Sequence, residues 1–111
     1  MDTITMSYKK LNQIHPKEIL PGYTVRFIHT DRMTFAYWDV KKGSPLPEHA
    51  HEHEQVANVL EGEYELTIDG ETQRLKPGDV AVIPSNVLHS GVAITDCRLM
   101  DVFAPVREDY L

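Results

Sequence analysis

Closely spaced turn dipeptides divide the chain into short apolar stretches, and this pattern limits the possible folds more than any other feature of the sequence. The turns lie at residues 61–62, 69–70, 77–79 and 84–86. Between and around them are short runs rich in β-branched, aromatic or alternating apolar residues, at 33–40, 55–60, 64–68, 80–83 and 98–103. Only residues 16–20 could form a helical turn. Short strands at short spacing without helices predict an all-β sandwich or closed barrel.

Length and charge narrow the class of protein further. The 111 residues are expected to form one domain, 1–111, and 41% of them are hydrophobic. Neither a membrane span nor a secretory signal is expected from the sequence. The one cysteine, Cys97, cannot form an internal disulfide, which predicts a reducing, cytoplasmic location. A net charge of −6 without clustered Lys or Arg argues against nucleic acid as a partner.

Two of the turns have hairpin character. Asp69-Gly70 is a strong signal for a two-residue hairpin, and Glu61-Gly62 is a weaker one. If Glu61-Gly62 connects two paired strands, Val59 faces Tyr64 and Gln55 shares their apolar face. We therefore expect Gln55 to point inward, where a buried amide needs hydrogen-bond partners or a ligand.

Three histidines alternate between residues 48 and 55. Residues two apart in a strand share a face, so His49 and His51 can present both imidazoles to one point, and Gln55 has the same parity. Imidazole nitrogens bind several first-row metal ions. A solvated, pH-sensitive surface run without a metal is the alternative. The residues alone leave both interpretations open.

The spacing around these histidines resembles the first motif of the cupin superfamily, G(x)5HxH(x)3–4E(x)6G. The chain runs from Gly43 through His49, His51 and Gln55 to Gly62 with the same intervals, and glutamine replaces the usual glutamate.

A later segment resembles the second cupin motif, G(x)5PxG(x)2H(x)3N. Gly78, Pro84 and His89 keep its spacing. Asn86 replaces a glycine, and asparagine tolerates a left-handed backbone better than most residues. Ala93 stands where the motif ends in asparagine.

The resemblance implies a cupin jelly-roll barrel with little or no helix. It also implies a divalent metal ion, with nickel, zinc, manganese and iron all compatible, whose ligands would be His49, His51, Gln55 and His89. A ligand pair shifted to His51 and His53 breaks the interval from Gly43, so His53 is expected at the rim of the site. His15 and His29 lie outside both motifs and are expected to be structural or exposed.

Residues 101–111 narrow the resemblance to small single-domain cupins of the pectin-degradation (KdgF) type. In that group an aspartate, a phenylalanine and an arginine at the spacing of Asp101, Phe103 and Arg107 line the pocket. Asp101 and Phe103 share strand parity, so both can face the pocket. From the residues alone, a salt bridge from Asp101 to Arg107 or Arg98 that only closes the barrel is the alternative.

Resemblance to this group implies an isomerase-type enzyme. The substrate would be a 4,5-unsaturated monouronate from pectin or alginate breakdown, converted to a linear keto sugar acid by ring opening and tautomerisation. Asp101 would move the proton, Arg107 would bind the carboxylate, and Phe103 would form the apolar wall. Arg26 is a candidate for a second anion contact. The metal would act as a Lewis acid.

Two other functions compete with this one. An oxygen-using metal cupin, a dioxygenase, also needs a histidine-rich site, although a neutral glutamine stabilises an oxidised metal less than glutamate does. A non-catalytic sugar-binding or sensory barrel is the other alternative. The N-terminal segment 1–22, strand-like over 3–14, has no evident partner in the core motifs. We therefore expect a homodimer in which this segment pairs across subunits or covers a sheet edge.

Overall fold

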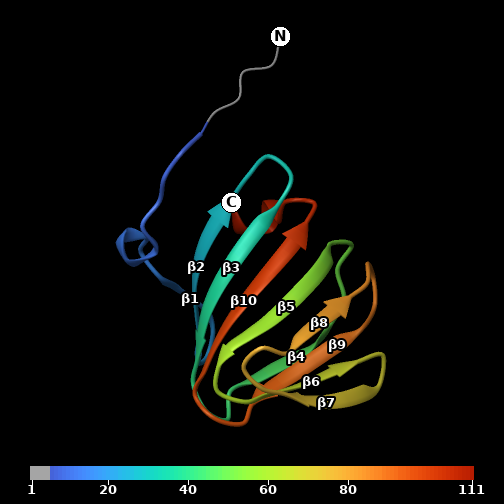
Figure 1. The fold of residues 1–111 in the computed structure, drawn as a ribbon. Helices are drawn as coiled ribbons and strands as arrows, with labels where there is room; N and C mark the ends of the chain where they lie inside the picture. The colour runs from blue at the N-terminus through green and yellow to red at the C-terminus, as the bar shows by residue number, and fades with distance from the viewer. Residues whose placement is uncertain (1–5) are drawn as a thin grey trace.

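The computed structural model describes residues 6–111, which form two antiparallel β-sheets that face each other (Figure 1). The larger sheet has the strand order β1-β2-β3-β10-β5-β8 and the smaller β4-β9-β6-β7. The strands are β1 (Lys17–Leu20), β2 (Tyr23–His29), β3 (Thr34–Val40), β4 (Pro45–His49), β5 (Glu54–Glu61), β6 (Tyr64–Ile68), β7 (Glu71–Leu75), β8 (Val80–Ile83), β9 (His89–Ala93) and β10 (Cys97–Ala104). The helical elements of residues 6–111 are two 3₁₀ turns, η1 (Leu11–Gln13) and η2 (Glu108–Tyr110). The predicted all-β class is confirmed, and no helix in this part of the chain could cross a membrane.

The core lies between the two sheets and is built from alternate residues of the strands. On β3 the buried residues are Thr34, Ala36, Trp38 and Val40, and the residues between them are partly exposed. On β10 the buried residues are Cys97, Leu99, Asp101 and Phe103. Figure 1 shows β10 between β3 and β5. The register pairs its buried polar residue, Asp101, with Ala36 on one side and Ala57 on the other, which places it inside the larger sheet.

The hairpin predicted at Asp69-Gly70 is confirmed. Ile68 pairs with Glu71 across the turn, in a register that leaves two residues in the loop. Both loop residues have positive φ, 49° for Asp69 and 79° for Gly70, as a type I′ turn requires.

The hairpin predicted at Glu61-Gly62 is wrong. β5 pairs with β8 and β10 in the larger sheet, whereas β6 pairs with β7 and β9 in the smaller one. Gly62, at φ 83°, carries the chain from one sheet to the other. Gln55 and Val59 on β5 and Tyr64 and Leu66 on β6 still face the core, so alternation fixes the inward face without fixing the neighbouring strand. The inward orientation predicted for Gln55 is accordingly confirmed, with 7% of the residue exposed.

The helical turn predicted for residues 16–20 is also wrong, because Lys17–Leu20 is an edge strand that pairs with β2. The Pro21-Gly22 turn, with Gly22 at φ 85°, reverses the chain at this point and favours a hairpin. The strand expected over residues 3–14 is absent from its described part, where η1 interrupts irregular backbone. Residues 3–5 lie outside the described residues.

Candidate metal centre

Three imidazoles from separate parts of the chain meet at one end of the barrel. His49 ends β4 and is the register partner of His89, which begins β9, and His51 follows in the loop before β5. The ring centroids of His49 and His89 are 4.1 Å apart, and that of His51 is 5.6 and 5.0 Å from them. One nitrogen of each ring lies within 4.8 Å of the others, an arrangement able to hold a metal ion.

Backbone carbonyls set the orientation of all three rings. The Nδ1 atoms of His49, His51 and His89 lie 2.8, 2.8 and 2.9 Å from the carbonyl oxygens of Pro47, His53 and Val87. Nδ1 therefore carries the proton and donates it, which leaves the Nε2 lone pair free, as in metal-binding histidines. His89 Nε2 is buried and has no hydrogen-bond partner in the described residues. A buried nitrogen with a free lone pair beside two others fits a bound metal ion.

Burial favours the neutral form of His51 and His89. It lowers the pKa of His89 to about 4, and it lowers the pKa of His51 together with the nearby Arg107 charge. A histidine must be neutral to coordinate a metal, so at neutral pH these two rings are already in the ligand state.

Gln55 comes to the same point from the larger sheet. Its Oε1 lies 3.2 Å from His51 Nε2. Because the His51 proton is on Nδ1, His51 Nε2 and Gln55 Oε1 are both acceptors. Two acceptors 3.2 Å apart are suited to binding the same cation. The four residues whose spacing resembles the cupin ligands therefore lie together in the fold.

Asp101 lies next to this group on β10. Its Oδ2 accepts a hydrogen bond of 3.1 Å from Trp38 Nε1, while Oδ1 is buried without a partner in the described residues. Burial raises the pKa of Asp101 to about 7, against the opposing effects of Gln55, Trp38 and Arg107. A carboxyl group with a pKa close to neutrality can both take up and release a proton.

The salt bridges considered as the alternative for Asp101 are not formed. Arg107 pairs with Asp109, and Arg98 pairs with Asp39 and Glu61 on the outer face of the larger sheet. Asp101 is therefore buried without an ion-pair partner in the described residues, and its hydrogen bond with Trp38 links β10 to β3.

A cavity of about 60 Å³ joins these groups. Its walls include His49, His51, Gln55, Trp38, Asp101, Phe103, Arg107 and Tyr110, together with Ile19 and Leu20 of β1. Arg107 is buried, and its guanidinium carbon is 4.8 Å from the Phe103 ring centroid and 4.3 Å from that of Tyr110. Phe103 also contacts the His51 ring, at 5.7 Å between centroids. The three residues expected to line the pocket, Asp101, Phe103 and Arg107, do line it.

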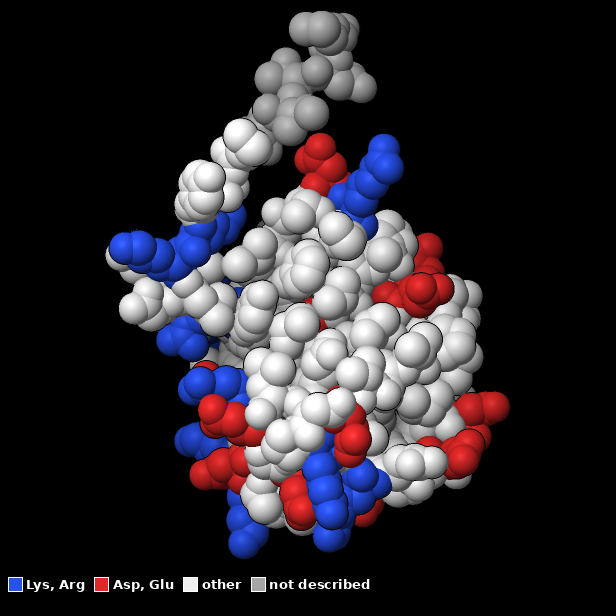
Figure 2. All heavy atoms as spheres, in the orientation of Figure 1, with Lys and Arg blue, Asp and Glu red and all other residues white. Residues whose placement is uncertain are grey.

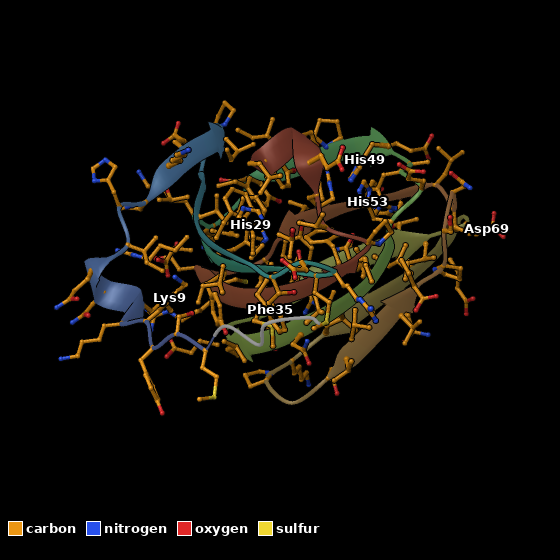
Figure 3. All side chains as sticks on the ribbon, turned by 90° about the horizontal axis from the view of Figure 1, so that it is seen from above. Lys9, His29, Phe35, His49, His53 and Asp69 are labelled. Carbon is orange, nitrogen blue, oxygen red and sulfur yellow. The ribbon has the colours of Figure 1, made fainter. Side chains whose placement is uncertain are left out.

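The remaining polar residues singled out from the sequence occupy other positions. The His53 ring packs against His51, at 5.7 Å between centroids, and Figure 3 shows His49 and His53 in the same part of the molecule. Arg26 lies outside the cavity, where it pairs with Asp39 at 3.5 Å and donates to the Ile14 carbonyl. His29 binds Thr34 instead, through a 2.8 Å contact between Nδ1 and Oγ1.

Three residues at this site were not indicated by the sequence motifs: Trp38, Asp109 and Tyr110. In the run 33–40, strand alternation places Trp38 on the inward face, so its burial can be predicted from the sequence. Its contact with Asp101 cannot. Asp109 and Tyr110 depend on the course of the chain after Pro105, which no periodic pattern predicts.

Comparison with known proteins agrees with this geometry. The family model described as a cupin domain matches residues 36–103. The pectin degradation protein KdgF of Dickeya dadantii is 38% identical over 72 residues, which are 63% of this chain and 66% of that protein. The structure of KdgF from Halomonas sp. superposes with a TM-score of 0.92 at 31% identity, covering 96% of this chain and 100% of the other.

Another relative is named as an enzyme with a different activity. The quercetin 2,3-dioxygenase of Bacillus subtilis is 47% identical over 51 residues, 44% of this chain and 15% of that enzyme. The chain thus spans just under two thirds of the Dickeya protein and a small part of the dioxygenase.

Proposed function

The chain belongs to the cupin family, and from this premise we propose that it is a metal-dependent enzyme acting on 4,5-unsaturated monouronates from pectin or alginate breakdown. The product would be the linear keto sugar acid, formed by ring opening and enol-to-keto tautomerisation. The observation that carries the proposal is one cavity lined by His49, His51, Gln55, Asp101 and Arg107, with His89 completing the imidazole cluster, in a chain similar to KdgF over 96% of its length.

His49, His51, Gln55 and His89 would hold the divalent ion. When bound, such an ion supplies Lewis acidity toward substrate oxygens. Three neutral imidazoles and an amide leave the positive charge of the ion undiminished. This donor set suits nickel, zinc, manganese or iron.

Asp101 would carry the proton in the tautomerisation. The reaction moves protons from oxygen to carbon and needs no electron acceptor. Trp38 fixes Oδ2, and the buried Oδ1 is the atom left to exchange a proton with the substrate. The pKa of about 7 lets the carboxyl group alternate between acid and base near neutral pH.

Arg107 and Phe103 would orient the substrate. A buried guanidinium can bind a uronate carboxylate through two parallel hydrogen bonds. Phe103 would form the apolar wall beside the sugar ring.

Binding a uronate requires the cavity to widen. Its volume of 60 Å³ is far below the roughly 300 Å³ at the lower end of small-molecule sites. The wall made by the exposed Ile19 of edge strand β1 is the one that could move without disturbing the core.

A spectrophotometric assay tests the proposal. The metal-loaded protein should abolish the ultraviolet absorbance of an unsaturated monouronate without consuming oxygen. Oxygen uptake with a phenolic or diketone substrate would instead support the dioxygenase alternative. Saturable uronate binding without any change of absorbance would support the sensory alternative.

We further propose that the protein is a cytoplasmic homodimer with a small anionic sugar as its ligand. On the face shown in Figure 2, Lys and Arg lie among Asp and Glu at the margin, which suits no extended nucleic-acid backbone. The buried thiol of Cys97 suits a reducing compartment. Light scattering at micromolar concentration should give twice the chain mass, and a monomer there would contradict the dimer.

A further inference from the structure

The C-terminal turn η2 holds the guanidinium of Arg107 in one orientation. Nε donates to Asp109 Oδ1 at 3.0 Å and Nη2 donates to Oδ2 at 2.8 Å, so the carboxylate binds one whole edge of the group. The Arg107 side chain is 9% exposed and that of Asp109 is 56% exposed. The aromatic contacts with Phe103 and Tyr110 restrict tilting of the guanidinium plane, and Asp109 restricts rotation within it.

Both ends of this short turn are attached to the barrel. The Arg107 backbone N–H donates to Oγ1 of the fully buried Thr34 at 2.8 Å. At the other end, the Tyr110 ring stacks on Phe27 with centroids 4.6 Å apart and planes at 26°. Asp109 is therefore carried by a segment whose position the fold determines.

The bond pattern leaves one edge of Arg107 available. A guanidinium has five N–H groups, of which Asp109 uses two, those on Nε and one on Nη2. The free N–H groups on Nη1 and Nη2 lie side by side, the geometry that matches a carboxylate. Arg107 also lines the cavity that contains His49, His51 and Asp101.

We infer that Asp109 is a positioning residue, which holds the Nε/Nη2 edge of Arg107 so that the Nη1/Nη2 edge faces the carboxylate of a ligand in the cavity. This inference rests on the proposed function. By holding Arg107 in place, Asp109 gives the cavity its preference for uronates over neutral sugars, although Asp109 has the same charge as a uronate.

Charge and positioning predict opposite results when Asp109 is neutralised. If Asp109 acted only through its charge, Asp109→Asn would strengthen the binding of an anion. If it positions Arg107, the same variant frees the guanidinium to rotate, and carboxylate binding weakens. Glu108 offers a matched control because it is exposed, lies in the same turn and has no ion pair or side-chain hydrogen bond with Arg107 in the described residues.

Calorimetric titration of the full-length, metal-loaded protein with D-galacturonate and with D-galactose provides the test. The preference for galacturonate, taken as the ratio of the two Kd values, should fall about tenfold in Asp109→Asn, the loss of roughly one charge-assisted hydrogen bond. It should remain unchanged in Glu108→Gln, and Asp109→Glu should recover part of it. Asp109→Ser replaces the asparagine variant if melting curves show that the latter does not fold.

An unchanged preference in Asp109→Asn, an equal loss in Glu108→Gln, or no preference in the wild type would each overturn the inference. The turnover assay distinguishes it from the proposed function. A protein without activity on unsaturated uronates whose galacturonate preference still depends on Asp109 would contradict the function and support the positioning role.

Discussion

At the scale of single residues, each clustered imidazole has one nitrogen bound to a backbone carbonyl and the other directed at its neighbours. Replacing His49 and His51 together by alanine should abolish metal binding, because only His89 and Gln55 would remain as ligands. Mass spectrometry of metal content should change from about one ion per chain to none. The circular dichroism spectrum should keep its β-type form, since neither ring belongs to the buried apolar core.

The exposed His15 provides the control for that experiment. His15→Ala removes an imidazole outside the cluster and should leave metal content unchanged. Full metal content in the double variant would rule out the assigned ligands.

Asp101 supports a second prediction at this scale. Asp101→Asn is nearly isosteric and can still pair with Trp38 Nε1, but it cannot exchange a proton. Turnover of the unsaturated uronate should fall about 10²–10⁴-fold, the usual contribution of a positioned acid or base. Metal content and melting temperature should stay close to those of the wild type.

Asp39→Asn is the matched control for the Asp101 variant. Asp39 is also a strand aspartate, but it pairs with Arg26 and Arg98 outside the cavity, so its loss should not alter turnover. Wild-type turnover in a folded, metal-loaded Asp101→Asn protein would exclude Asp101 from the chemistry.

The sequence allowed the inward face of Gln55 to be predicted, because alternation along a strand is a local property. It also placed His49 and His51 on one face by the same rule. The contact between Trp38 and Asp101 joins residues 63 positions apart in the chain, and it follows from β3 pairing with β10. No local pattern specifies that pairing.

At the scale of elements, the two Gly-containing turns before and after β6 differ in their surroundings. A Cβ on Gly62 would clash with the Asp96 carbonyl oxygen, whereas a Cβ on Gly70 would meet nothing within 4 Å. Both glycines have positive φ. Gly70→Ala should therefore cost only the backbone strain of about 1–2 kcal/mol. Gly62→Ala should cost a further ~1–3 kcal/mol from the clash.

Urea unfolding of the two alanine variants measures this difference directly, since each serves as the control for the backbone strain of the other. Equal destabilisation would show that the chain between the sheets can shift to accept a side chain at residue 62.

The same two turns show which elements can be predicted from sequence. Asp69-Gly70 forms its hairpin because both residues adopt positive φ locally. Glu61-Gly62 has a similar sequence, but the pairing of β5 with β10 and β8 draws the chain into the other sheet. The sequence likewise does not predict strand β1, because among residues 6–111 its four residues pair only with β2.

The turn η2 supports a prediction about pH. The Arg107 guanidinium holds the pKa of Asp109 below its usual range, so the pair stabilises the fold above the unfolded-state pKa of about 3.9. This contribution disappears as the pH falls through the lowered pKa of the folded state. Asp109→Asn should therefore destabilise the protein at pH 7 by less than about 1 kcal/mol, because Asp109 is half exposed, and by less at pH 2 than at pH 7.

Urea unfolding at the two pH values tests the prediction, with Glu108→Gln as the variant expected to show no such difference. Equal destabilisation by Asp109→Asn at pH 7 and pH 2 would mean that the side chain contributes by packing and not by its charge.

At the scale of the whole molecule, the candidate ligands connect the two sheets. His49 and His89 belong to the smaller sheet, and Gln55 belongs to the larger one. An ion that binds only this folded arrangement stabilises it by about 2.7 kcal/mol at a free concentration of 100 times its Kd. Chelation should therefore lower the melting temperature, and added divalent metal should restore it.

The His49→Ala/His51→Ala protein should show no response to chelator or metal in the same melting experiment. A wild-type melting temperature that is insensitive to both would argue that the ion, if bound, does not join the sheets.

The central position of β10 determines when the protein can fold during its synthesis. β3 and β5 leave the ribosome well before β10, yet each needs β10 to satisfy one of its two edges. Until residues 97–104 emerge, the nascent chain carries two strands with open edges, which can pair with other nascent chains. Any delay before residues 97–104 emerge would prolong that state and favour aggregation.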